Sequence, residues 1–149
     1  SEEKLLKNYK NINFYDHQGT HWSPLCVHID MWNKVGGFSE EFNPGIGSDP
    51  DFNMKLWSNG VRIFKGLNDF KVYHFASLTT RKNSKVIQNK GDNTFLKKWG
   101  FSIKFFKRFY MKTNKKYDGP LNEPIKSTSF YLNLIICKIK LIYVKLFII

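Results

Sequence analysis

The fold of the first half of the chain is decided by two short stretches, GGFSEEF at residues 36–42 and GSDPDF at residues 47–52. The glycines interrupt regular structure before residue 48. Ser48 is a residue type that caps helices, and Asp51 stands three positions further on, as in a capping box. Pro50 suits a first helical turn, and Gly60 suits a helix end. We therefore predict a helix from residue 48 to residue 59, with two carboxylates in its first turn.

Those two carboxylates, Asp49 and Asp51, are candidates for chemistry. The amino end of a helix stabilises an ionised carboxylate, and an ionised carboxylate in a cleft can accept a proton from a substrate hydroxyl. Because the two residues are two positions apart, they point to different sides of the turn. One can face a cleft while the other caps the helix. The spacing alone leaves open a second interpretation, in which both carboxylates only cap the helix and contact solvent.

Local patterns predict the elements around this helix. The segment from residue 77 to residue 91 is a polar, basic loop, and residues 114–127 form a linker with one glycine and two prolines. We expect short strands at residues 11–17, 61–64 and 71–75, and helices at residues 30–35, 92–99 and 102–112.

The order of these stretches resembles the C-terminal half of glycosyltransferase family 2 enzymes, which have the GT-A fold. That family has GGFDE.F, then ED.DL, then a helix that ends in glycine, then a strand with a "v.H" step. Here GGFSEEF, SDPDF, Gly60 and VYH at residues 72–74 match over residues 21–80. Ser39 replaces the usual Asp, and Ser48 replaces the usual Glu. The resemblance implies an α/β fold, the C-terminal portion of a Rossmann-like GT-A domain with a mixed sheet, followed by a helical C-terminal extension.

The resemblance also implies a reaction. Asp49 stands where the family has its catalytic base, and Asp51 is then the helix cap or a second carboxylate. The base would deprotonate an acceptor hydroxyl, whose oxygen attacks the anomeric carbon of a nucleotide-diphosphate sugar with inversion. A divalent cation, Mn²⁺ or Mg²⁺, would help the diphosphate to leave. The acceptor is expected to be a glycan or a lipid-linked molecule.

Further substrate-binding candidates precede the helix. The stretch of His21, Trp22, Ser23 and Pro24 lies where the family places residues that line the donor or acceptor sugar, and Gly47 belongs to the glycine loop. Trp22 can stack on the apolar face of a sugar, since such faces suit aromatic rings. A buried core position for Trp22 is the alternative.

Three more candidates follow the helix. His74 is a candidate metal ligand, with a structural role as the alternative. Arg81 and Lys82, on the basic loop, are candidates for binding the diphosphate through charge-assisted hydrogen bonds, with a solvated loop as the alternative. The Asp-x-Asp metal motif of the family is not found before Asp49. We therefore expect the nucleotide-binding part, with most metal ligands, to precede residue 1.

This reading divides the chain into three parts. Residues 1–91 form the acceptor side of the transferase domain, residues 92–127 form basic helices and a linker, and residues 128–149 form an apolar and basic C-terminal helix. Charge follows the same division. Residues 1–51 have four Lys and eight Asp or Glu, a net charge of −4, whereas residues 52–149 have 20 Lys or Arg and four Asp or Glu, a net charge of +16. Basic surfaces attract anionic lipid, phosphorylated substrates or nucleic acid.

The segment KFFKRFY at residues 104–110 keeps a nucleic-acid-binding module open as an alternative function, although it equally fits an amphipathic helix with a Phe face. No recognised nucleic-acid motif is present, so we expect no specific nucleic-acid partner. A non-catalytic membrane-surface domain is the other alternative.

The tail from residue 130 to residue 149 is apolar, but Lys138, Lys140 and Lys145 interrupt it. Each central Lys in a spanning helix costs about 2.5–3.5 kcal/mol, so we expect a helix on an anionic membrane surface or a helix packed on the protein. Cys26 and Cys137 form no close pair, which indicates two buried thiols in a reducing compartment. The expected location is the cytoplasm, including the cytoplasmic face of the membrane.

Overall fold

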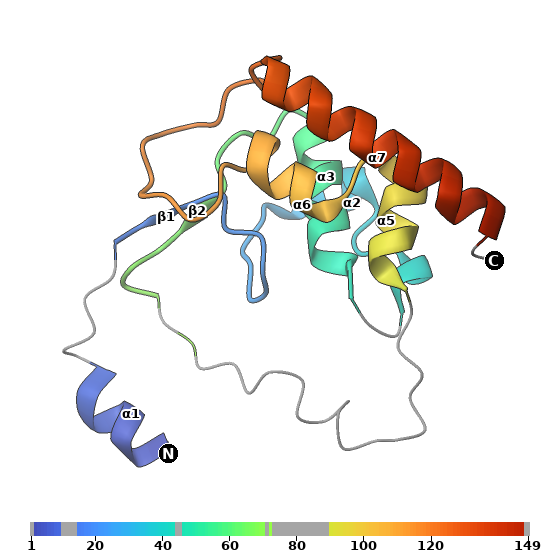
Figure 1. Ribbon diagram of the computed structural model, residues 1–149. Coiled ribbons are helices and arrows are strands. Elements are labelled where there is room, and N and C mark those ends of the chain that lie inside the picture. Colours follow the sequence, from blue (N-terminus) through green and yellow to red (C-terminus); the bar gives the residue numbers. More distant parts are fainter. Residues whose placement is uncertain (1, 10–14, 44–45, 71, 73–89, 148–149) are drawn as a thin grey trace.

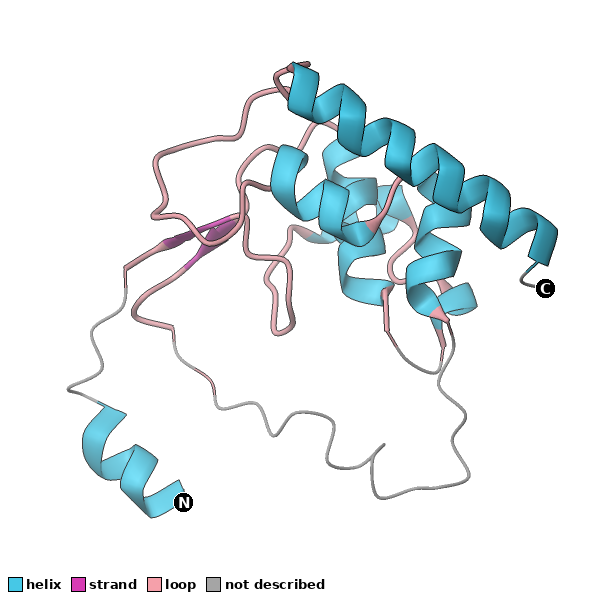
Figure 2. Ribbon diagram, in the orientation of Figure 1, coloured by secondary structure: helices cyan, strands magenta, loops and turns pink. Residues whose placement is uncertain are grey.

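Helices make up most of the regular structure in the computed structural model, which describes residues 2–9, 15–43, 46–70, 72 and 90–147 (Figures 1 and 2). A short 3₁₀ turn, η2, spans Glu40–Phe42, and a π-helical turn, η3, spans Phe106–Tyr110. The α-helices are α1 (Glu2–Asn8), α2 (Ile29–Val35), α3 (Ser48–Ser58), α5 (Gly91–Trp99), α6 (Ile103–Phe105) and α7 (Thr128–Phe147).

Helix α3 lies at the centre of the core, and seven of its eleven residues are buried. On one side Phe52 packs against Trp32 of α2 and against Phe38, with ring centroids 5.1 and 5.0 Å apart. On another side the ring of Trp57 meets Tyr110 edge-on at 5.4 Å. A helix that is buried nearly all round belongs inside a domain, so α3 holds its first turn in a fixed place.

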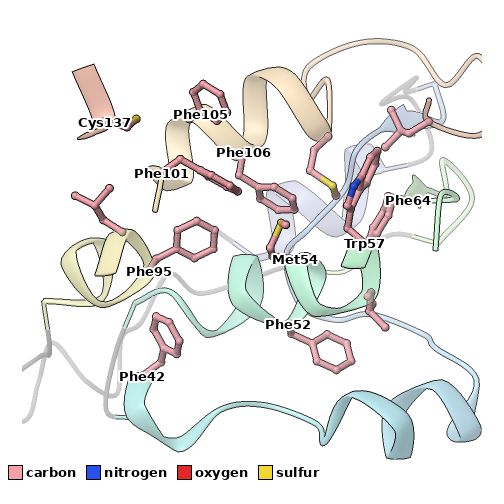
Figure 3. Close-up of a cluster of buried hydrophobic side chains, with 14 of the residues drawn as sticks. Phe42, Phe52, Met54, Trp57, Phe64, Phe95, Phe101, Phe105, Phe106 and Cys137 are labelled. Atoms are coloured by element: carbon pink, nitrogen blue, oxygen red, sulfur yellow. The ribbon is translucent and has the colours of Figure 1, made fainter. Parts of the chain in front are cut away.

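Aromatic rings fill the space between α3, α5 and α6 (Figure 3). Phe95 and Phe101 have centroids 6.1 Å apart, and Phe101 and Phe105 have centroids 5.2 Å apart. Phe105 then meets Phe130 of α7 edge-on at 5.0 Å. The high Phe content of the sequence therefore serves a core of interlocking rings, which are the side chains that bury the most apolar area.

Helix α7 packs across α5 and α6 (Figure 1). Its buried residues are Phe130, Cys137 and Val144, which recur every seven residues and so lie on one face. Cys137 is the buried thiol that the sequence predicts, whereas Cys26 is exposed, and both are free. Among the residues that the structure describes, no helix is both long and apolar enough to cross a membrane.

One two-stranded antiparallel sheet is present in the described part of the chain. Strand β1 (His17–Gln18) pairs with β2 (Lys65–Gly66) in the register His17 to Gly66. The strand predicted at residues 61–64 is wrong, since this segment makes single hydrogen bonds rather than a ladder: the carbonyl of Phe64 accepts from Gly19, and that of Arg62 accepts from Leu121. Most of the other two predicted strands, at residues 11–17 and 71–75, falls outside the described residues.

The helix predictions are confirmed to within two residues at 30–35, 48–59, 92–99 and 130–149. The predicted helix at residues 102–112 is instead divided, with α6 passing into the π-helical η3. Here the amide of Met111 donates to the carbonyl of Phe106, five residues earlier, at 3.1 Å. The wider turn places Phe106 and Met111 fully inside the core.

Candidate functional site

The first turn of α3 follows a glycine whose conformation a side chain would prevent. Gly47 is the N-cap residue, with φ of 110°, and no side chain caps the helix. A Cβ at this position would lie 2.6 Å from the ring of Phe42. The prediction that Ser48 caps the helix is therefore wrong by one residue, and the structure gives Gly47 a packing role.

Asp49 faces the loop that precedes α2. Its Oδ1 accepts a hydrogen bond from the hydroxyl of Ser23 at 2.8 Å, across 26 residues of sequence. Asp49 is half-buried, while Ser23 and Pro24 are exposed. The structure thus brings together two of the residues that the sequence singles out, and it places their contact at the surface.

Trp22 stands beside this pair with its side chain open to solvent. It is 53% exposed, so the alternative of a buried core Trp is wrong. The Nζ of Lys107 lies 5.4 Å from the centre of the Trp22 ring, which is cation–π distance. The exposed indole can offer a flat apolar face to a sugar, and the carboxylate that contacts the next residue, Ser23, can accept a hydrogen bond.

His21 and Asn53 hold this loop against α3. The resemblance includes His21 in the stretch that lines the sugar, whereas the sequence does not single out Asn53. Asn53 is buried and donates to the backbone carbonyl of Asp49 at 2.7 Å and to that of His21 at 3.3 Å. His21 is 4% exposed, and its Nδ1 donates to the carbonyl of Gly19 at 3.0 Å. No sequence signal marks the contact between Asn53 and His21, because it depends on where the loop meets the helix.

The imidazole of His21 is held in its neutral form. Burial lowers its pKa below the ordinary value, and nearby Lys107 adds to this, while the hydrogen bond to Gly19 acts in the opposite direction. Its Nε2 is buried without a hydrogen-bond partner among the described residues. The charge of Asp49 also acts to raise the pKa of His21, but burial has the larger influence and favours the neutral ring.

Asp51 is fully buried and belongs to a different set of contacts. Its carboxylate accepts from the indole Nε1 of Trp99 at 2.8 Å and from the hydroxyl of Ser39 at 2.7 Å. The Nζ of Lys98 lies 3.0 Å from its Oδ1. The prediction that Asp51 caps the helix is therefore wrong, since its side chain connects α3 to α5 and to the loop before η2.

Lys98 completes this buried group. Besides Asp51 it contacts Glu41, with 2.6 Å between Nζ and Oε1. Burial alone would lower the pKa of Lys98, but the hydrogen bonds that its ammonium donates to Glu41 and Asp51 outweigh burial, and the pKa is raised. An Asp at position 39 would set a second carboxylate against Asp51, whereas the hydroxyl of Ser39 donates to it. Ser39 therefore suits this cluster.

A metal site is not formed by the described residues alone. No group of three His, Cys, Asp or Glu side chains among them is arranged to hold an ion. Asp51 already pairs with Lys98, so its carboxylate does not fit a cation as well. The predicted metal ligand His74 and the predicted diphosphate ligands Arg81 and Lys82 lie outside the described residues.

Comparison with known proteins gives no further assignment: no family model matches the chain, and no curated protein or solved structure matches it.

Proposed function

We propose that the chain is the acceptor side of an inverting glycosyltransferase, in which Asp49 is the general base. The observation that carries this proposal is the position of Asp49, at the first turn of a buried helix and hydrogen-bonded to Ser23, which directly follows the exposed Trp22 in the chain. Its support is geometric together with the sequence resemblance to glycosyltransferase family 2.

In the proposed reaction the proton of the acceptor hydroxyl moves to Asp49. The acceptor oxygen then forms a bond to the anomeric carbon of the nucleotide sugar, and the bond from that carbon to the phosphate oxygen breaks. The electron pair leaves with the nucleoside diphosphate. Ser23 already donates to Oδ1 of Asp49, so we assign the second oxygen, Oδ2, to the acceptor hydroxyl. A base of this kind acts within about 2.6–3.2 Å of the oxygen that it deprotonates.

The groups around Asp49 have supporting roles in this proposal. Ser23 restricts the rotation of the carboxylate, and Asn53 fixes the backbone that carries it. Trp22 offers its face to the acceptor sugar. His74, Arg81, Lys82 and a divalent cation belong to the proposal through the resemblance, and no step above is assigned to them.

Both cysteines are free, which fits a reducing compartment, and we propose the cytoplasm as the location of this activity.

The proposal is tested by assaying the full-length protein with a panel of nucleotide-diphosphate sugars and with glycan and lipid-linked acceptors, following release of the nucleoside diphosphate. Asp49→Asn is expected to lower transfer at least about 100-fold, because a general base contributes on the order of 10²–10⁴ in rate. Asp30→Asn is the matched control, since Asp30 is an exposed carboxylate in the first turn of α2. Its transfer rate is expected to stay unchanged. Full activity in Asp49→Asn overturns the assignment of the base, and a folded wild-type protein without transfer to any acceptor overturns the function.

A further inference from the structure

The outward face of α7 is apolar although it packs against nothing in the described structure. Nine large apolar side chains between residues 131 and 147 are at least half exposed. The middle of this face consists of five residues, which are between 55 and 68% exposed: Leu132, Ile135, Ile139, Ile142 and Leu146. Helical periodicity puts them opposite Phe130, Cys137 and Val144, which face the core. Helix α7 therefore has two apolar faces, and the core covers one of them.

Lysines border the outward face on both sides. By the same periodicity Lys138 and Lys145 lie along one edge, and Lys140 lies along the other. The sequence of α7 contains no Asp or Glu. Long Lys side chains can extend from the edge of an apolar surface to reach charged groups beside it. This pattern is typical of a helix that lies in the plane of a membrane surface.

A basic cavity adjoins the Lys140 edge. It has a volume of about 890 Å³ and is lined by residues of α6, η3, the segment after η3 and α7. Asp92 is the one carboxylate in its lining. Six cationic side chains line it: Lys104, Lys107, Arg108, Lys112, Lys115 and Lys140. A concave surface with this excess of positive charge attracts phosphate groups.

We propose that α7 binds an anionic membrane surface, with its outward face between the headgroups and the acyl chains and with lipid phosphates in the basic cavity. The two features adjoin along one edge of the helix, since Ile136, Cys137 and Lys140 of α7 line the cavity. Apolar burial and attraction to anionic headgroups then act together, which is how interfacial helices bind. This inference does not rest on the proposed transferase activity.

Charge distinguishes a membrane from other occupants of this face. A second copy of the chain, docked through α7, would bring lysines against lysines, because the helix offers no carboxylate to pair with them. Nucleic acid would use the cations, but it would leave the five central apolar side chains in water. An anionic bilayer satisfies both features at once.

The experiment is flotation of the full-length protein with vesicles of phosphatidylcholine, with and without phosphatidylglycerol. The protein is expected to float with the anionic vesicles, and its binding is expected to fall as salt rises. Ile135→Gln combined with Ile142→Gln is expected to reduce flotation at least about tenfold, since each change removes an apolar side chain from the acyl boundary. The matched control is Ile63→Gln combined with Ile125→Gln, at two isoleucines that are 60 and 78% exposed elsewhere. Flotation of this control is expected to equal that of the wild type.

A second pair tests the charges. Lys104→Gln combined with Lys140→Gln is expected to weaken binding to anionic vesicles, whereas Lys34→Gln combined with Lys126→Gln, at exposed lysines outside the cavity, is expected to leave it unchanged. All these side chains are at the surface, and a thermal melt confirms that each variant is folded.

Three results would overturn the proposal. One is equal flotation with neutral and anionic vesicles, or none with either. Another is binding to duplex DNA that needs the cavity lysines but not the two isoleucines, without flotation. The third is a dimer in sedimentation that the isoleucine pair disrupts, without flotation.

Discussion

Asp49 and Asp51 are two residues apart in the first turn of α3, yet one side of that turn meets solvent and the other meets the core. On the solvent side Asp49 accepts a hydrogen bond from Ser23, which follows the exposed Trp22 in the chain. On the core side Asp51 is 0% exposed and has Lys98, Trp99 and Ser39 as partners. The same residue type therefore serves two purposes, because burial and partners decide what a carboxylate can do.

The two carboxylates are therefore expected to matter for different properties, Asp51 for the stability of the fold and Asp49 for proton transfer. A buried carboxylate with a paired cation contributes to the fold, and removing either partner leaves the other uncompensated. A half-exposed carboxylate with a free lone pair can exchange a proton with a substrate. Substitutions on the two sides of the turn are accordingly expected to affect different measurements.

The largest effect on stability is expected from Asp51→Asn. The change removes the charge that pairs with Lys98 and puts an amide donor next to other donors, so the free energy of unfolding should fall by about 2–4 kcal/mol. Urea denaturation measures this. Asp49→Asn, two residues away, is the control, and surface changes of that kind stay within about 0.5 kcal/mol. If Asp51→Asn and Asp49→Asn have the same free energy of unfolding, the buried carboxylate does not stabilise the fold more than the half-exposed one.

A smaller loss is expected from Lys98→Met, because the buried carboxylate of Asp51 keeps its hydrogen bonds from Trp99 and Ser39 and water can reach the partly exposed position of the ammonium. Hydrogen bonds to charged groups contribute roughly 1.5–3 kcal/mol each, and we expect a loss near the lower limit. Since the folded-state pKa of Lys98 is raised above 10.5, its contribution is complete below about pH 10.5 and is lost as pH rises through the folded pKa.

Stability measured between neutral and alkaline pH checks this dependence on Lys98. The wild-type protein should lose more stability above pH 10.5 than Lys98→Met does. Lys104→Met, at an exposed lysine, should follow the wild type. If the stability of Lys98→Met depends on pH as that of the wild type does, Lys98 does not stabilise the cluster around Asp51 through its charge.

The smallest effect on stability is expected from His21, which holds the loop of Ser23 against α3. Burial lowers the folded-state pKa of His21 below 6.5, so the unfolded chain binds more protons just below that pH. Stability is therefore complete above about pH 6.5 and is lost as pH falls through the folded pKa. His21→Asn should flatten this acid dependence, as measured by urea denaturation from pH 7.5 to 5. His28→Asn is the control, since His28 is exposed and Asn also caps helices. If the free energy of unfolding depends on pH in the same way in both variants, His21 does not cause the loss of stability in acid.

The local part of this fold could be predicted from the sequence. Pro50 and Gly60 bound α3 through signals that act over a few residues, and the structure confirms that helix. The partners of Asp51 could not be predicted, because Lys98 and Trp99 are 47 and 48 residues away in sequence and reach it only through packing. The true N-cap was missed for a similar reason, since the ring of Phe42 requires Gly47.

Helix α7 shows the same limit on a larger scale. Its sequence is apolar nearly all round, so periodicity identified neither the face that packs on Phe105 nor the face that stays exposed. In the candidate site, the resemblance singled out both Ser23 and Asp49, but only the structure shows that they touch. Trp22 left two interpretations open, and its exposure excludes the buried core position.

The most direct test of the two roles is rescue of an alanine variant by a small carboxylate. The measurement is the transfer rate of Asp49→Ala and of Asp51→Ala with and without formate, each corrected for the folded fraction. We predict that Asp49→Ala is folded, has lost transfer, and recovers part of it with formate, because a diffusible base can enter the exposed position. For Asp51→Ala we predict a loss that follows unfolding and no response to formate. Wild-type transfer in Asp49→Ala, or equal recovery of both variants, would contradict the assignment of Asp49 as the base.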